Sequence, residues 1–492
     1  MSASNNTKNL LMIFGAALAL SACGNGADEV VSPGIPANPP TAPTPAPTPT
    51  PSPTPGTGTA AESCPDGTVN QGTIASNTLR ACLLPATMTG TVTLKKLDGV
   101  AYQLKGQTNV GEDQGGDANA PLAGKARGTL YVEPGVTVFG RDGGDFLLVN
   151  RGSQIFALGT ADQPITFTSL QGLEGNGAKG NWGGIVISGR APINSCQGSA
   201  VAGAADCQAV IEGTSGSYFG GNSSADNSGE LKYVRGLYSG YAIGNGNELQ
   251  TLTLAGVGSG TKIEYFQSYA SKDDGIEIFG GSVNLKHIVI LDYDDDGLDT
   301  DHGWNGGAQF GLVIRSAGKT VDAGGSGLEW SSINRLPVSQ PKIANFTILN
   351  KDDKLESLVK VNESTNARIL NSVVVTAPAS NSNGQAETCF ALSNGTLPAP
   401  DVTRLELHSV YFSCAKPFNN ATAETIYNSA TKSNTTLNTS STLNGFVNGA
   451  SENAVAVHDA KSVHSFFDNV SYIGAVKDAN DNWWKGWTVG LE

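Results

Sequence analysis

Lys272–Ile278 reads KDDGIEI and Asp294–Thr300 reads DDDGLDT, so one pattern recurs at a spacing of 22 residues. In both segments acidic residues precede a glycine, after which apolar and polar residues alternate. A spacing of about 22 residues is typical of one coil of a parallel β-helix, a solenoid in which each coil packs only against its neighbours. The repeat therefore predicts an all-β chain that folds as a right-handed parallel β-helix.

The rest of the folded part reads as a series of short strands. Apolar or alternating runs such as Thr129–Val132, Ile165–Thr168 and Ile185–Ser188 are separated by Gly, Asn and Asp, and no run shows a convincing helical period. Such a pattern also suits a β-sandwich, which is the alternative interpretation. The turn and strand at Gly159–Ser169 favour the β-helix.

If 22 residues make one coil, residues at that offset lie side by side. Three pairs of carboxylates then stack, namely Asp273 with Asp295, Asp274 with Asp296, and Glu277 with Asp299. Upstream, the same offset places Leu254 beside Ile276 and Gly258 beside Gly280. Adjacent coils lie about 4.8 Å apart, so each like-charge pair costs about 3–4 kcal/mol at an effective dielectric constant of about 20. A bound cation relieves this repulsion.

The ligands on offer are oxygens, which favours Ca²⁺. The run Asp292-x-Asp294-x-Asp296-Gly297 matches the first half of a calcium loop, but the twelfth position is Gly303 instead of Glu, so the match to an EF-hand fails. The predicted metal ligands are Asp273, Asp274, Glu277, Asp292, Asp294, Asp295, Asp296, Asp299 and Asp301. The alternative is a solvated acidic edge that binds no metal.

The N-terminus predicts a bacterial lipoprotein. Lys8 precedes an apolar run, Leu10–Leu20, that is shorter than the ~20 residues needed to span a bilayer and has the length of a signal peptide. The run ends in Leu20-Ser21-Ala22-Cys23, the pattern of a lipobox, so we expect residues 1–22 to be removed and a diacylglycerol to be attached to Cys23. Gly24 follows, at a position where lipoproteins kept at the inner membrane usually have Asp. This favours the outer membrane, on either its surface or its periplasmic face.

Four regions are predicted in the mature chain. Residues 23–61 are a lipid-anchored linker rich in Pro and Thr, too poor in apolar residues to fold and extended by its prolines. Residues 62–127 form an N-terminal cap, 128–420 the β-helix and 421–492 a C-terminal cap. In the last region, Trp483, Trp484 and Trp487 are expected to cover the open end of the solenoid.

The net charge of the chain limits the classes of molecule that it can bind. The chain has 30 basic and 44 acidic residues, a net charge of −14, and loss of residues 1–22 makes it −15. Such a chain is a poor partner for nucleic acid, whereas cations and basic surfaces stay open.

Apart from Cys23 the chain has six cysteines, none in a C-x-x-C spacing. An even number in an export compartment favours disulfides over metal binding or catalysis. Among 15 possible connectivities we favour the pairs that are adjacent in the sequence, Cys64–Cys82, Cys196–Cys207 and Cys389–Cys414.

Several motifs together resemble one family. They are NWGGIVI at Asn181–Ile187, SGELKYVR at Ser228–Arg235, DGIEIFGGSVN at Asp274–Asn284, the segment Asp294–Trp304, YIGAV at Tyr472–Val476 and the segment Trp483–Trp487. The chain resembles a group of poorly characterised bacterial outer-membrane and secreted β-helix proteins, similar to the leptospiral LipL-type outer-membrane lipoproteins. The resemblance covers roughly Gly128 to the C-terminus. It implies an envelope lipoprotein and carries no catalytic residues over.

Signatures of catalysis are largely missing from the sequence. There is no G-x-S-x-G nucleophile motif, and Gly318-Lys319-Thr320 lacks the upstream glycine of a phosphate loop. We therefore favour an outer-membrane-anchored, cation-binding platform whose partner is a glycan, a protein or a TonB-dependent receptor. The alternative is a Ca²⁺-dependent lyase or hydrolase of an acidic polysaccharide, with Lys272 drafted as a base beside the carboxylates.

Overall fold

The computed structural model describes most of the chain after the predicted linker. The described residues are 58–491 except 215, 245–246, 321–323, 333–334, 353, 363–364, 377–387, 393–403 and 439. The predicted signal peptide, Cys23 and nearly all of the linker lie outside them. In the described part, no helix combines the length and the apolar character that a membrane crossing requires.

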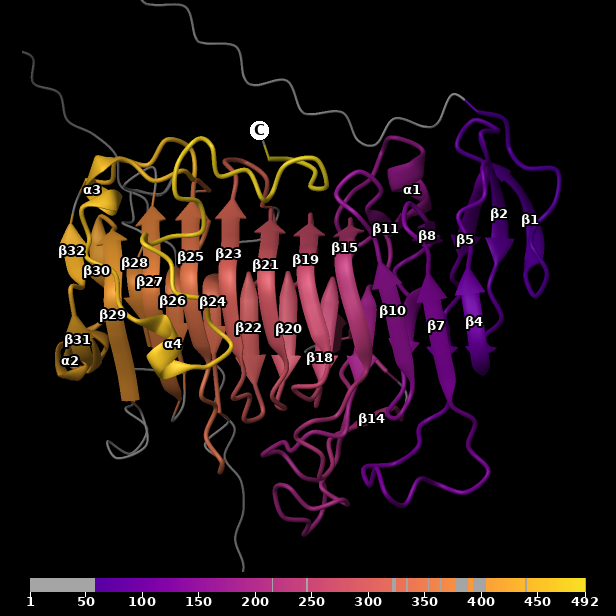
Figure 1. The fold of residues 1–492 in the computed structure, drawn as a ribbon, viewed down its shortest axis with the longest axis horizontal. Helices are drawn as coiled ribbons and strands as arrows, with labels where there is room; N and C mark the ends of the chain where they lie inside the picture. The colour runs from indigo at the N-terminus through magenta and orange to yellow at the C-terminus, as the bar shows by residue number, and fades with distance from the viewer. Residues whose placement is uncertain are drawn as a thin grey trace, which may run out of the picture. The chain divides into compact units, whose positions relative to one another are not determined.

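The described residues form a parallel β-helix, which confirms the predicted fold class (Figure 1). Coil follows coil as strands of two parallel sheets, called here the long sheet and the short sheet. One coil consists of β19 (Lys262–Tyr269) and β20 (Ile276–Phe279), and the next of β21 (Asn284–Leu291) and β22 (Leu298–Asp301). Both strands keep the predicted spacing of 22 residues, because Lys262 lies beside Asn284 and Ile276 beside Leu298.

The other coils repeat this arrangement. In the long sheet they contribute β4 (Gly90–Leu94), β5 (Val100–Gln103), β7 (Gly128–Val132), β8 (Thr137–Gly140), β10 (Gln154–Leu158), β11 (Ile165–Ser169), β15 (Gly229–Leu237), β23 (Gly307–Arg315), β25 (Lys342–Asn350), β27 (Asn366–Thr376), β29 (Arg404–Ser413), β31 (Thr431–Ser433) and β32 (Thr436–Asn438). In the short sheet they contribute β3 (Thr87–Met88), β6 (Gln107–Val110), β9 (Phe146–Val149), β12 (Ile185–Ser188), β18 (Leu252–Ala255), β24 (Ser326–Trp330), β26 (Ser357–Val361), β28 (Thr388–Ala391) and β30 (Lys416–Phe418). Parallel pairing thus extends beyond the predicted span 128–420, since β4 pairs with β7 and β29 with β31.

Smaller elements decorate the coils. At the N-terminal end, β1 (Val69–Ile74) pairs antiparallel with β2 (Leu79–Leu83). The connections between coils contain two hairpins, β13 (Ala209–Val210) with β14 (Tyr218–Phe219) and β16 (Tyr241–Gly244) with β17 (Asn247–Leu249). Short helices in the described residues are α1 (Leu170–Leu173), α2 (Ala421–Ser429), α3 (Ala450–Asn453) and α4 (Ala460–Val463).

Apolar side chains stack inside the solenoid. Leu252, Ile276, Leu298 and Leu328 occupy one register of the short sheet and are at most 1% exposed. Three disulfides join the predicted partners, Cys64–Cys82, Cys196–Cys207 and Cys389–Cys414, which confirms the predicted connectivity.

In the long sheet, the successive strands β15, β19, β21 and β23 each turn a corner at one residue with a positive φ. Tyr233, Tyr265, His287 and Phe310 hold φ values between 49° and 59° in successive coils. Their rings stack, with centroids 4.4 Å apart for Tyr233 and Tyr265 and 4.3 Å apart for Tyr265 and His287. A non-glycine residue rarely adopts this conformation, so the stacked rings offset its cost.

The register predicted upstream was wrong by two residues. Leu252, and not Leu254, lies beside Ile276. Gly256 accordingly takes the place that we predicted for Gly258. The reason is the length of the turns, because six residues connect β18 to β19 whereas four connect β20 to β21.

The last part of the chain returns along the outside of the long sheet (Figure 1, yellow). Trp484 and Trp487 are buried there against outward-facing residues such as Leu312 and Leu349. The side-chain amide of Gln267 donates to the carbonyl of Val489 and accepts from its N–H. The prediction that these tryptophans cover the open end was therefore wrong, because outward apolar residues of the long strands offer them a lateral surface.

Candidate metal centre on the outer face of the short sheet

The outer face of the short sheet carries a row of charged side chains. Strand alternation turns Ile276 and Ile278 into the core and Glu277 outward. The register then places Glu277 beside Asp299, Asp299 beside Glu329, and Glu329 beside Lys360. We call Glu277, Asp299 and Glu329 the acidic row.

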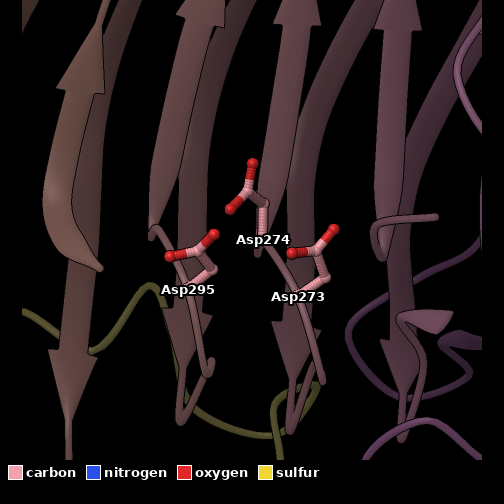
Figure 2. Close-up of side chains that lie close together, drawn as sticks. All are labelled: Asp273, Asp274 and Asp295. Atoms are coloured by element: carbon pink, nitrogen blue, oxygen red, sulfur yellow. The ribbon is translucent and has the colours of Figure 1, made fainter. Parts of the chain in front are cut away.

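The turn that precedes each short strand adds further carboxylates. Ligand oxygens of Asp273, Asp274 and Asp295 lie within 4.8 Å of one another, and so do those of Asp274, Glu277 and Asp299. Asp274 belongs to both groups. Figure 2 shows Asp273 and Asp274 on one turn and Asp295 on the neighbouring one. The predicted stacking of Glu277 on Asp299 and of the two acidic turns is therefore present.

Glycines allow the two turns to approach so closely. Gly275 donates its N–H to the carbonyl of Asp296, and a Cβ atom on Gly275 would lie 2.7 Å from the carbonyl oxygen of Gly297. Gly297 stands in the same relation to Gly327 of the next coil. Each acidic pair of the turns is thus followed by a position where any residue larger than glycine would push the neighbouring backbone away.

Burial makes the charged forms of these carboxyl groups costly. Burial raises the pKa values of Asp274, Glu277 and Asp299 well above the ordinary range, and neighbouring carboxylates raise them further. Burial, followed by the carboxylate of Asp295, raises the pKa of Asp273 to about 8. The Oδ1 atom of Asp299 is shielded from solvent and has no hydrogen-bond partner. Such a site favours either protons or a cation.

The remaining predicted ligands point elsewhere. Asp292 accepts the N–H of Ser316 at 2.8 Å. Lys179 and Lys272 both form ion pairs with Asp294.

Asp296 accepts a short hydrogen bond from the N–H of Ser326, and Asp301 pairs with the His302 ring at 3.4 Å. Asp292, Asp294, Asp296 and Asp301 thus lie outside the two groups of three carboxylates. The half calcium loop predicted at Asp292–Gly297 is not gathered at one point, because backbone N–H groups and lysines engage its oxygens.

Some neighbours of the site were missed in the sequence. Glu329 lies 30 positions after Asp299, so a search at a spacing of 22 does not find it, although a leucine precedes both acidic residues. Lys360 pairs with Glu329 at 2.9 Å. Burial lowers the pKa of Lys360, but Glu329 outweighs this effect and raises it overall. Glu212, between β12 and β15, and Glu248, in β17, add to the negative charge around Asp273.

An insertion between β12 and β15 covers part of the same face. Its Cys196–Cys207 disulfide precedes the β13–β14 hairpin, whose Phe219 packs against Phe279 of β20. A cavity of about 250 Å³ opens beside this contact, next to the acidic row. Its lining consists of Val210, Ile211, Glu212, Thr214, Phe219, Phe279 and His302.

A comparison with protein families places this architecture. The family described as a pectate-lyase like beta helix domain matches residues 103–488. The chain belongs to this family. The match includes the acidic row, the insertion and the C-terminal return of this pectate-lyase-like β-helix. It gives no support for the finer resemblance to LipL-type lipoproteins. No curated protein and no solved structure matches the chain.

Proposed function

We propose that this pectate-lyase-like β-helix binds Ca²⁺ through Asp274 and its neighbours and serves in the cell envelope as a binding platform for a glycan. One observation carries the proposal. Asp274 links two groups of close carboxylates, and in one of them the buried Oδ1 of Asp299 has no hydrogen-bond partner. Ca²⁺ takes six to eight oxygen ligands in a flexible arrangement, which a row of turn and strand carboxylates suits.

The cation also gives the row a role in recognition. A face lined by carboxylates repels a glycan that carries carboxylates, and a bound divalent cation reverses this repulsion. Calcium ions held in the row would leave coordination positions for the oxygens of a sugar. The family description, which refers to a pectate lyase, supports a polysaccharide as the partner.

An enzyme that cleaves the glycan is the second candidate. The cavity beside carboxyl groups with raised pKa values favours it, because glycosidases use one carboxyl group as an acid and another as a base or nucleophile. A lyase is less well served, since Lys360 stays protonated beside Glu329 and Lys272 pairs with Asp294. A platform and an enzyme differ in whether the bound glycan changes.

Retention on immobilised polygalacturonate distinguishes the two functions. With millimolar Ca²⁺ we expect the protein to be retained, and a chelator to release it. We expect neither new reducing ends, the product of a hydrolase, nor unsaturated ultraviolet-absorbing ends, the product of a lyase. Turnover that is lost in Glu277→Gln would establish the enzyme instead. Retention that is insensitive to chelator would contradict the platform.

The location in the envelope is part of the proposal. The lipobox ending at Cys23 supports a lipid anchor, and Gly24 supports the outer membrane, with a glycan or a TonB-dependent receptor as partner. A closer relationship to the LipL-type lipoproteins rests on the shared motifs alone.

Cys23→Ala is expected to move the protein from the membrane fraction to the soluble fraction, or to stall removal of the signal peptide, because the thiol receives the lipid. Cell fractionation with immunoblotting measures both effects, and Cys23→Ser serves as a second thiol-free variant. Unchanged membrane partition of both variants would contradict the anchor.

A further inference from the structure

The cavity beside the acidic row has a rigid aromatic floor. Phe219 and Phe279 are 1% and 6% exposed, and their ring centroids lie 5.9 Å apart. The ring of His302 stands edge-on to both, at 5.8 and 5.2 Å. Val210, 42% exposed, marks its outer rim. An aromatic floor of this kind suits the C–H face of a sugar ring or a cation.

The insertion that forms the cavity wall is held in place at several points. The Cys196–Cys207 disulfide closes a loop within it, and the hydroxyl of Ser188 in β12 donates to the carbonyl of Tyr218 at 2.6 Å. Ile211 and Phe219 belong to an apolar cluster on the outer face of the short sheet. The cavity is therefore preformed, which lowers the cost of ordering the site when a ligand binds.

The charge of the cavity selects against anions. Glu212 lines it, and among the described residues of the lining there is no lysine or arginine. Burial raises the pKa of Glu212 and the charges of Glu248 and Asp301 raise it further, whereas the backbone N–H that Glu248 donates to it and the His302 ring lower it. The lining histidine, His302, faces Asp301 at 3.4 Å. A free carboxylate in this cavity would meet carboxylates, whereas an ammonium group would be attracted.

We infer that this cavity binds an amino sugar with a free ammonium group, whose ammonium meets Glu212 and whose ring lies against Phe219 and Phe279. The hydroxyl of Thr214, on the same lining, is available to a sugar hydroxyl. The inference rests on the proposed glycan-binding role and narrows it, because the calcium-binding carboxylates recognise acidic units and this cavity recognises a cationic one. The bound glycan would then contain at least one amino sugar with a free ammonium group.

Binding of three monosaccharides to the calcium-saturated, full-length protein tests the inference. The probes are glucosamine, N-acetylglucosamine and galacturonic acid, each measured by isothermal titration calorimetry and saturation-transfer NMR. We expect glucosamine to bind about tenfold more tightly than N-acetylglucosamine, because acetylation removes a charge-assisted hydrogen bond. We expect no binding of galacturonic acid in this cavity.

Two variants locate the site. Glu212→Gln is expected to reduce glucosamine binding to the level of N-acetylglucosamine, and Glu174→Gln, at an exposed position away from the cavity lining, is expected to leave it unchanged. Displacement of bound glucosamine by galacturonic acid, equal binding of glucosamine and its acetylated form, or full glucosamine binding by Glu212→Gln would overturn the inference. The comparison of sugars uses the unaltered chain, so it holds even if a variant misfolds. Failure of all three sugars, with calcium still bound, would remove the amino-sugar site and leave the calcium site standing.

Discussion

The melting temperature of the metal-free protein is expected to fall as the pH rises from about 4 to about 8. Burial raises the pKa of Asp273 from 3.8 to about 8, and the carboxylates of Asp295, Glu248 and Glu212 add to the effect, while a hydrogen bond from Gln250 opposes it. Between these pH values the folded chain keeps a proton that the unfolded chain has lost. The contribution of this proton to the free energy of unfolding is therefore fully present below about pH 4 and is lost as the pH rises through about 8.

Millimolar Ca²⁺ is expected to remove most of this fall. A ligand that binds only the folded state stabilises it by about 2.7 kcal/mol at a hundredfold excess over Kd. For a chain of this length that amounts to a few degrees, present at pH 8 and small at pH 4.5, where protons compete for the same oxygens. Differential scanning calorimetry with Ca²⁺ or with a chelator measures the shift, and Mg²⁺ should replace Ca²⁺ poorly because it demands a tighter octahedral shell.

Asp274→Asn provides the matched variant for these melts. The amide keeps an Oδ1 that accepts the N–H of Asp296 and removes a charge shared by both carboxylate groups. We expect it to melt higher than the parent at pH 8 without metal and to lose the calcium shift. Asp162→Asn, in an exposed turn, serves as the control and should change neither. Superimposable melts with and without Ca²⁺ at pH 8 would contradict calcium binding and would favour the alternative, an acidic edge that binds no metal.

The fold was predictable because two coils happen to have turns of equal length. The repeat at Lys272–Ile278 and Asp294–Thr300 reports the true register of β20 and β22. The register fails one coil upstream, where two extra residues enter a turn. It fails again downstream, where 30 residues separate Asp299 from Glu329. Turn lengths vary on the outside of a solenoid at little energetic cost, whereas the strands keep their stacking.

The site was predictable only in part, for a related reason. Asp273, Asp274, Glu277, Asp295 and Asp299 come together because strand pairing fixes them. Asp292 and Asp294 resemble calcium ligands in spacing, but distant groups engage them, among them Lys179, over a hundred positions away in the sequence.

Glu212 and the cavity belong to an insertion whose docking depends on packing against the short sheet. The tryptophans of the C-terminal return depend in the same way on the long sheet. A single sequence carries no direct signal of such long-range packing, beyond the Cys196–Cys207 pair that closes the insertion.

Isothermal titration calorimetry of the metal-free, full-length protein with Ca²⁺ at pH 8 measures directly whether the carboxyl groups around Asp274 bind the ion. We expect saturable Ca²⁺ binding with release of protons, because buried carboxyl groups such as Asp273 must lose theirs to coordinate the ion. We also expect binding to weaken as the pH is lowered to 5, to be abolished by Asp274→Asn and to be unchanged by Asp162→Asn. The absence of saturable heat in the parent protein, or equal binding by Asp274→Asn, would show that these carboxyl groups are not a calcium site.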